Sequence, residues 1–419
     1  MNILIRRAQT EWPAWLAIAF VGLLPFRRLA EIPLSIFAIS LLFLLRSEVH
    51  RARIRSLLPL LLPLFLCFWL PMVLSSFDSY DPQKSWITSL ASVRYFLAAM
   101  SIGVLLNSAS LRWLVLRWCS YLLIFWAVDG YVQMAAGVDL FGISMHEERL
   151  NALFGNKYQF YGPTLAMLSP LLFEHARRRW PAWAWGVSFA LILGAVMISG
   201  MRAGWLAMGM VVFAYILLMF RKDNRELRRA TWIAPLLALV VIVISYQVSP
   251  TVQERVSRTL TIAQGSESAL DYALSWRLPI FNASLRMYRE NPVNGIGVRA
   301  YPVAYPSYAP PDDYHLVHSE GGMRATHAHN IVLEVMADTG SIGLLGLILG
   351  FGLALRTWRG MLPADRQEVF PYALALTLIL FPFNSHFAIY GTFTSSLIWF
   401  LMGLAAASWR RKTDHMSVG

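Results

Sequence analysis

Long apolar runs recur along the chain from Trp15 to the C-terminus, with short polar segments between them. A run of about 20 mostly apolar residues is long enough to cross a bilayer as a helix. Because lipid cannot satisfy exposed backbone groups, only helices and closed barrels span it, and runs of this length favour helices. We therefore expect an all-α fold, in the form of a polytopic integral membrane protein with about twelve transmembrane helices.

The first two apolar runs are short, and Arg27, Arg28 and Glu31 lie between them. Charged residues are unfavourable in a lipid-exposed helix, so we expect a hairpin or a re-entrant pair there. The predicted spans are residues 16–26, 32–45, 57–76, 89–106, 113–130, 158–175, 181–199, 202–220, 231–247, 329–355, 367–387 and 392–409.

Composition narrows the class of protein. Hydrophobic residues make up 57% of the 419 residues and charged residues 14%, and the mean hydropathy is +0.51. A soluble fold of this size cannot bury that much apolar surface, so intrinsic disorder, a disulfide scaffold and a cytosolic enzyme are excluded. Cys67 and Cys119 lie inside apolar runs, where free thiols behave as small buried hydrophobes. They carry no redox or metal signal.

The net charge of +12 could indicate nucleic-acid binding, but the basic residues lie between the apolar runs and not along one polar face. Membrane topology explains them better. With a cytoplasmic N-terminus, 22 of the 36 lysines and arginines fall in cytoplasmic segments, and seven of the other 14 lie in one long loop. The positive-inside bias has little force in such a loop. We expect both termini in the cytoplasm, a retained first helix, and the loop from Val248 to Ala328 outside.

Three segments are therefore predicted: residues 1–247 with nine transmembrane helices, residues 248–328 as a helical external domain, and residues 329–419 with three more transmembrane helices.

Within the external domain, residues 251–264 form a polar amphipathic stretch, and residues 268–290 carry apolar side chains at helical spacing. Asn291-Pro292 ends that helix, because proline disfavours the helical conformation in the residue before it. Residues 301–314, with four prolines and four tyrosines, are expected to be irregular.

Arg202 stands at the predicted external start of the helix 202–220. This position is doubly unfavourable for an arginine, since it opposes the positive-inside bias and lies at the positive end of the helix macrodipole. A bound anion removes both objections, because the guanidinium and the free N-terminal amides can share it. The alternative is an interfacial arginine paired with an acid from the loop.

His329 lies in the segment Thr326-His327-Ala328-His329-Asn330, at the predicted external start of another helix. A helix N-terminus lowers the pKa of an imidazole by destabilising its cation, so His329 should stay neutral near pH 7, as a general base requires. The alternatives are a capping or interfacial histidine and a metal site of His327 and His329. The nearest acids, Glu320 and Glu334, complete no recognisable metal spacing, so no metal is expected.

The external loop contains arginines but no lysine. Arginine favours bidentate contacts to phosphate or carboxylate, which makes these residues candidates for anion binding, although a solvated face explains several of them equally well. In the preceding external segment, Arg149 and Lys157 are further candidates. The adjacent Asp312 and Asp313 are expected to face solvent. The seven loop arginines are Arg255, Arg258, Arg277, Arg286, Arg289, Arg299 and Arg324.

Three motifs resemble those of the bacterial O-antigen ligases and the related O-antigen polymerases. His329-Asn330, followed after nine residues by Gly340-Ser341-Ile342-Gly343, resembles their H-N-x9-G-x-x-G signature. Ser199 to Trp205 resembles their S-x-x-R-x-G-W segment, and Asn291 to Gly297 their N-P-x-x-G-x-G turn. The resemblance spans about residues 145–350, and the family's plan of twelve helices with one large late external loop covers the rest.

The resemblance implies a glycosyltransferase supplied by a lipid carrier. A ligase of this family moves a finished O-polysaccharide from undecaprenyl pyrophosphate to a sugar hydroxyl of the lipid A-core, at the periplasmic face of the bacterial inner membrane and without a metal or other cofactor. These two glycolipids and the membrane lipids would be the partners, with no role for nucleic acid.

The resemblance also implies residue roles. The family's essential histidine corresponds to His329 and its first essential arginine to Arg202. A second arginine, in the loop helix before the N-P turn, corresponds best to Arg277, with Arg286 and Arg289 as competitors. The predicted catalytic residues are thus His329, Arg202 and Arg277. The predicted substrate-binding residues are Arg149, Arg286, Arg289, His327 and Asn330.

This chemistry is consistent with the residue types. Without a metal, the charge that grows on a leaving pyrophosphate must be stabilised by arginines, for which Arg202 and Arg277 are available. His329 would take the proton of the acceptor hydroxyl as its oxygen attacks the anomeric carbon, and a single displacement of this kind inverts the configuration.

Other functions remain open. An O-antigen polymerase uses the same donor but elongates a second carrier-linked chain, and protein O-oligosaccharyltransferases share the histidine motif but are usually longer. A flippase or transporter of another class would also have a dozen helices. It would carry ionisable residues near mid-bilayer and two related halves, whereas the polar outliers here cluster at external helix ends.

Overall fold

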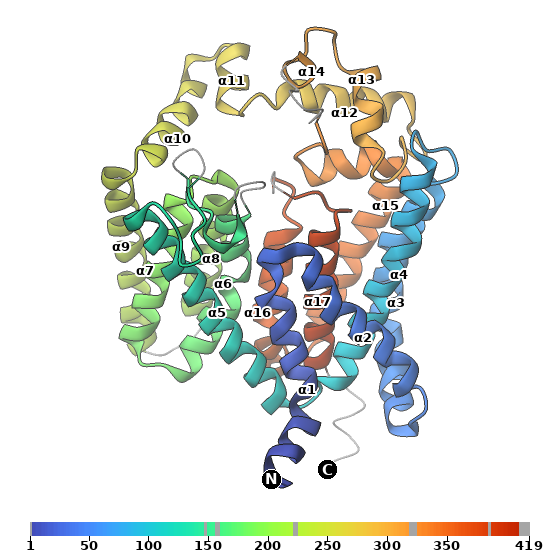
Figure 1. Ribbon diagram of the computed structural model, residues 1–419, viewed down its shortest axis with the longest axis vertical. Helices are drawn as coiled ribbons and strands as arrows, with labels where there is room; N and C mark the ends of the chain where they lie inside the picture. Colours follow the sequence, from blue (N-terminus) through green and yellow to red (C-terminus); the bar gives the residue numbers. More distant parts are fainter. Residues whose placement is uncertain are drawn as a thin grey trace. The chain divides into compact units, whose positions relative to one another are not determined.

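The computed structural model describes residues 2–145, 149–155, 160–220, 225–317, 325–383 and 387–409. The secondary structure of these described residues consists of helices, with no β-strand among them. Figure 1 shows the helices coloured from the N- to the C-terminus. The prediction of an all-α membrane protein is confirmed at this level. The helices belong to two compact units.

The first unit comprises residues 1–33, 108–260 and 370–379. In it, α5 packs against α1, α6 and α7, while α6 packs against α8, and α9 against α7 and α8. Its helices are α1 (Asn2–Gly22), η1 (Leu24–Ala30), α5 (Ala109–Ala136), η2 (Ala152–Phe154), α6 (Tyr161–Arg179), α7 (Ala182–Ile198), α8 (Arg202–Phe220), α9 (Arg225–Val248) and α10 (Pro250–Leu260).

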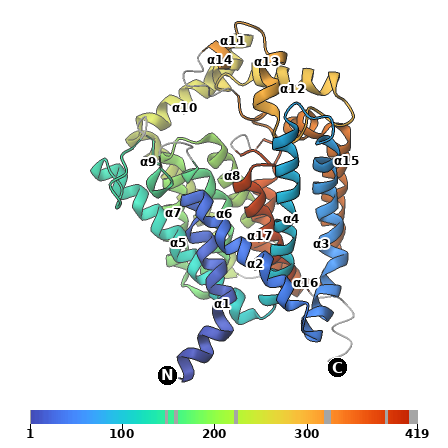
Figure 2. The same cartoon turned by 45° about the vertical axis from the view of Figure 1, so that its right-hand side comes forward.

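The second unit comprises residues 34–107, 261–369 and 380–419. Here α3 packs against α4 and α15, α17 against α4, and α12 against α15, as Figures 1 and 2 both show for α3, α4 and α15. Its helices are α2 (Glu31–Leu44), α3 (Glu48–Ser75), α4 (Pro82–Leu105), η3 (Thr261–Gln264), α11 (Glu267–Ala273), α12 (Leu278–Glu290), α13 (Tyr301–Tyr308), α14 (Tyr314–Val317), α15 (Ile331–Gly360), the start of α16 (Pro363–Ile379) and α17 (Thr392–Ser408).

Four described helices are long and apolar enough to cross a membrane: α3, α4, α5 and α15. A fifth span results if the pair Pro235–Val248 and Pro250–Gln264, bent by 103°, counts as one. Three shorter apolar helices are Ala182–Ile198, Arg202–Leu217 and Thr392–Ser408. Length and composition therefore support a helical membrane protein with four or five spans, fewer than the twelve expected from the apolar runs.

The segment between residues 248 and 328 is helical, but its elements differ from the prediction. The amphipathic stretch forms α10 and η3 as expected, and α12 ends at Glu290 before Asn291-Pro292. The single helix expected over residues 268–290 is instead α11 and α12. Between them, Ser275 and Trp276 have φ values of 61° and 60°, which no helix accommodates.

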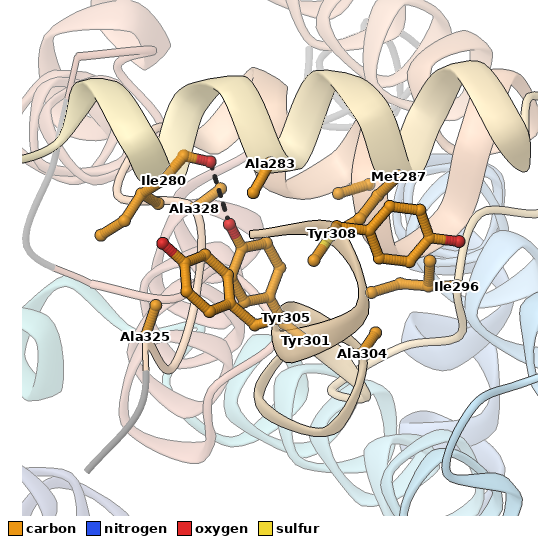
Figure 3. Close-up of a cluster of buried hydrophobic side chains, with 11 residues drawn as sticks. Ile280, Ala283, Met287, Ile296, Tyr301, Ala304, Tyr305, Tyr308, Ala325 and Ala328 are labelled. Atoms are coloured by element: carbon orange, nitrogen blue, oxygen red, sulfur yellow. Dashed lines mark hydrogen bonds between the residues drawn. The ribbon is translucent and has the colours of Figure 1, made fainter. Parts of the chain in front are cut away.

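The expectation of irregular structure over residues 301–314 is wrong, because Tyr301–Tyr308 forms α13. Pro302 lies in the first turn, where proline is tolerated. Tyr301, Tyr305 and Tyr308 share one face at helical spacing and are buried against α12, as Figure 3 shows. This burial outweighs the proline content.

Asp313 is buried, so the expectation that it faces solvent is also wrong, while Asp312 is exposed. The Tyr305 hydroxyl donates to both carboxylate oxygens of Asp313 at 3.1 Å, and the backbone N–H of His315 donates at 2.8 Å. Burial raises the pKa of Tyr305 above its usual range, which keeps this hydroxyl a donor. Asp313 therefore holds the segment after α13.

Candidate functional site

Arg202 is the first residue of α8, as predicted, and a tight turn from α7 positions it. The Ser199 hydroxyl donates to the carbonyl of Val196 at 2.6 Å, and the Trp205 indole donates to the carbonyl of Met197 at 3.0 Å. A Cβ on Gly204 would lie 3.3 Å from the backbone of Gly162, so a glycine lets α8 approach the start of α6. The Ser199 to Trp205 motif is thus the turn that fixes Arg202.

Arg202 lies beside two arginines of α10. Its Nη1 donates to the Thr259 hydroxyl at 3.2 Å, and the Thr259 hydroxyl donates to the carbonyl of Arg255 at 2.7 Å. Burial, and then the positive charges of Arg255 and Arg258, disfavour the charge of Arg202. We call Arg202, Arg255 and Arg258 the arginine cluster. Sequence reasoning named Arg255 and Arg258 only as loop arginines; their i, i+3 spacing on an amphipathic helix was the available signal.

One acid contact of the arginine cluster is long. Arg255 is 8% exposed, and its Nη1 lies 3.9 Å from a carboxylate oxygen of Glu254, whose side chain is 56% exposed. At this distance a solvent-exposed carboxylate contributes little. Guanidinium groups keep their protons, so positive charge gathered in this way favours an anion nearby.

Arg149 lies next to the same turn in the first unit. A Cβ on Gly200 would lie 4.0 Å from Cγ of Arg149. Two side chains of α5 hold the preceding loop: Asp129 accepts from the backbone N–H groups of Leu140 and Leu153, and Gln133 from those of Asn151 and Ala152. Lys157, the other candidate of this segment, lies outside the described residues.

A strained turn carries the two histidines of the second unit. His329 has φ of 51°, in the left-handed region that side chains other than glycine rarely adopt. The rings of His327 and His329 lie 4.0 Å apart between centroids, and Nδ1 of His327 is 3.0 Å from the Thr326 hydroxyl. Ala328 between them belongs to the buried cluster around α12 and α13 (Figure 3). We call residues 327–330 the histidine turn.

Asn330 caps the helix that follows the histidine turn. Its side-chain Oδ1 accepts from the backbone N–H groups of Val332 at 3.0 Å and Leu333 at 3.1 Å. An N-cap of this kind satisfies backbone donors that the helix cannot pair itself. The side-chain oxygen of Asn330 therefore has a structural role, which was not expected when Asn330 was predicted to bind substrate.

The turn Asn291 to Gly297 and the segment Gly340 to Gly343 pack backbone against backbone after the histidine turn. We call this contact the glycine joint. Within α15, Gly340 has φ 62° and ψ −155°, and a Cβ there would lie 2.2 Å from the carbonyl oxygen of Val293. Gly295 has φ 71°, and its Cβ would lie 2.4 Å from the carbonyl oxygen of Ala337. The backbone N–H of Ser341 donates to the carbonyl of Pro292 at 2.8 Å. Only glycine fits both positions, because the two backbones touch.

Two carboxylates of α15 lie buried at this joint, and sequence reasoning missed them as a pair. Glu334 is 1% exposed and Asp338 is 2% exposed. The backbone N–H of Arg299, a residue with φ of 66°, donates to Oδ2 of Asp338 at 3.0 Å. The available signal was the i, i+4 spacing of two acids at the start of an apolar helix.

The three competing loop arginines differ in their surroundings. Arg277 is the half-buried N-cap residue of α12, after the strained Ser275 and Trp276. Arg286 is half-buried, its charge acts on Tyr305, and its Nε has no hydrogen-bond partner among the described residues. Arg289 is exposed in the last turn of α12.

The eight predicted site residues thus divide between the units. Arg149 and Arg202 lie together in the first unit, and the remaining six lie in the second. Within the described residues, no group of three or more His, Cys, Asp or Glu side chains could hold a metal ion.

These features define a helical membrane protein in which cationic and imidazole side chains stand at the starts of apolar helices. Residues 187–348 match the family described as O-antigen ligase, which supports membership of this part of the chain in that family. The matched segment contains all three motifs, from Ser199 through the histidine turn to Gly343. Such membership points to a glycosyltransferase-like enzyme of lipopolysaccharide biosynthesis. No curated protein matches the chain.

Proposed function

We propose that the protein is an O-antigen ligase, which transfers O-polysaccharide from undecaprenyl pyrophosphate to a sugar hydroxyl of the lipid A-core. The observation that carries this proposal is the family match over the segment that contains both the Arg202 turn and the histidine turn. In this proposal the protein lies in the bacterial inner membrane with cytoplasmic termini, the shorter apolar helices also cross, and the segment between residues 248 and 328 faces the periplasm.

His329 acts as the general base in the proposed reaction. Its imidazole accepts the proton of the acceptor hydroxyl while that oxygen bonds to the anomeric carbon of the donor sugar. The bond from this carbon to the pyrophosphate oxygen breaks on the opposite face, so the configuration inverts and undecaprenyl pyrophosphate leaves. Base catalysis of this kind contributes roughly 10²–10⁴-fold in rate.

The arginine cluster stabilises the charge that develops on the leaving pyrophosphate. Arg202 has two further guanidinium groups close by, which suits a ligand with concentrated negative charge. Arg277 serves as the second leaving-group arginine, and Arg149 binds the same anion from beside the turn. No metal is required, because the arginines supply the positive charge that a metal would otherwise provide.

The remaining candidates bind or position substrate. Arg286 and Arg289 lie on α12, where the charge of Arg286 acts on Tyr305 and Arg289 is exposed for contact with a glycan. His327 packs against His329 and restricts its ring, and Asn330 holds the helix start on which His329 depends.

Reconstitution of the purified protein tests the proposal. The protein is supplied with a carrier-linked glycan and two acceptors in separate reactions: lipid A-core and a second carrier-linked glycan. We expect extension of the lipid A-core alone. Extension of the carrier-linked acceptor alone would identify an O-antigen polymerase. Movement of the donor across the bilayer without any new glycosidic bond would identify a transporter.

A further inference from the structure

Glu334 and Asp338 form a buried carboxylate pair with an unbalanced charge. They stand four residues apart on α15, so their side chains share one face of the helix. Both are almost fully buried. No described residue donates a hydrogen bond of ordinary geometry to either carboxylate oxygen of Glu334 or to Oδ1 of Asp338. We call these two residues the carboxylate pair.

One cation faces the carboxylate pair. Among the described residues, Arg299 is the cation whose charge acts on both carboxylates, and its N–H also donates to Asp338. The other titratable groups that face the pair are the hydroxyls of Tyr301 from α13 and of Tyr390, both neutral near pH 7. The backbone of Ile389 and Tyr390 also lies beside Glu334.

Two ionised carboxylates and one guanidinium would leave one negative charge buried and unpaired. Such a charge is strongly unfavourable, and a carboxylate escapes the penalty by binding a proton. When two carboxylates lie close together and cannot both ionise, the usual outcome is one proton shared between them. With that proton, the carboxylate pair and Arg299 together carry no net charge.

We propose that Glu334 and Asp338 bind one proton between them, and that the resulting neutral cluster keeps the imidazole of His329 uncharged and able to act as a base. His329 precedes α15 by two residues, and the helix rise places the backbone of Glu334 about 7–8 Å further on. Helical side chains lean toward the N-terminus, which is the end of α15 that follows the histidine turn. An unpaired negative charge there would stabilise the imidazolium instead. The role for His329 rests on the proposed function, whereas the shared proton does not.

Infrared spectroscopy of the full-length protein tests the shared proton directly. We expect a C=O stretching band of a protonated carboxyl group at pH 7 that shifts in D₂O. It should vanish in both Glu334→Gln and Asp338→Asn, since each variant leaves one carboxylate to pair with Arg299. Absence of the band from the unaltered protein would overturn the proposal, as would a thermal midpoint that rises specifically with sodium or potassium, because a bound cation would then replace the proton.

The pH dependence of transfer tests the effect on His329. Glu334→Gln keeps the cluster neutral, so the acid limb of kcat/KM should stay in place. Glu334→Gln with Asp338→Asn leaves the Arg299 charge unbalanced, disfavours the imidazolium, and should move the acid limb down by roughly half to one pH unit. A downward shift already in the single variant would mean that the pair is doubly ionised, which contradicts the proposal.

The two proposals fail in different ways. If His329→Ala retains transfer while the carboxyl band is present, the role of His329 as base is lost and the shared proton stands. If the band is absent while His329→Ala loses transfer, the base assignment stands and the shared proton is wrong.

Discussion

The arginine cluster of the first unit and the carboxylate pair of the second both gather like charges, but they resolve the repulsion differently. Arginine keeps its proton at any physiological pH, so Arg202, Arg255 and Arg258 stay positively charged side by side. Glu334 and Asp338 can bind a proton and have Arg299 beside them. We therefore propose that the arginine cluster binds an anionic ligand, whereas the carboxylate pair supports the histidine turn from within.

Loss of the imidazole at position 329 should have the largest effect. His329→Ala removes the proposed base, and we expect transfer to fall by about 10²–10⁴-fold in kcat at unchanged protein levels, measured with purified protein. His50→Ala, which removes an imidazole near the start of α3, is the matched control and should remain fully active. Retained turnover in His329→Ala would remove this residue as the base and leave the second region with no catalytic role.

Altering the arginine cluster should come next in size. Arg202→Lys keeps the charge but loses the planar fork, so we expect a loss of roughly 10- to 100-fold in kcat/KM. Arg202→Met should lose more. Arg55→Ala, which removes an exposed arginine near the start of α3, serves as the control with little loss. Equal activity of Arg202→Lys and the unaltered protein would show that a point charge suffices there.

The glycine joint should affect stability before activity. Gly340→Ala forces a Cβ against the carbonyl of Val293 at a backbone conformation suited to glycine, and we expect a loss of about 2 kcal/mol or more. Gly352→Ala lies in the same helix, where a Cβ meets nothing within 4 Å, and should be neutral or slightly stabilising. Thermal unfolding in detergent measures the stability of both variants. Equal midpoints would contradict the requirement for glycine at position 340.

The cap at Asn330 should give the smallest change. Asn330→Ala removes the acceptor for two backbone N–H groups and should cost about 1 kcal/mol, whereas Asn330→Ser should restore most of it. The readout is the thermal midpoint together with KM for the donor. If Asn330→Ser restores stability but leaves KM raised, Asn330 also contacts substrate.

Apolar run length correctly predicted a helical membrane protein, and the helix start at Arg202 was also predicted. Run length also suggested twelve spans, because short apolar runs satisfy the same pattern as long ones; four or five described helices are long enough by length and composition. Helix α13 was not predicted because its proline content indicated irregular structure. The helical spacing of Tyr301, Tyr305 and Tyr308, which places all three in the buried cluster, was the better indicator.

The site was less accessible to prediction than the fold. The neighbours of Arg202 depend on how α10 follows α9, and Arg299 reaches Asp338 across 38 intervening residues through a joint of two backbones. His329 adopts the left-handed conformation, which the sequence does not reveal because residues other than glycine rarely adopt it. Tertiary packing, and not local pattern, determines each of these.

The central claim is that Arg202 and His329 act in the same chemical step. A double-mutant cycle on kcat/KM, with Arg202→Ala, His329→Ala and the double variant, measures this directly. We expect strong non-additivity, with the double variant losing little more than His329→Ala alone. Losses that multiply fully would show that the two residues act independently, contrary to this proposal.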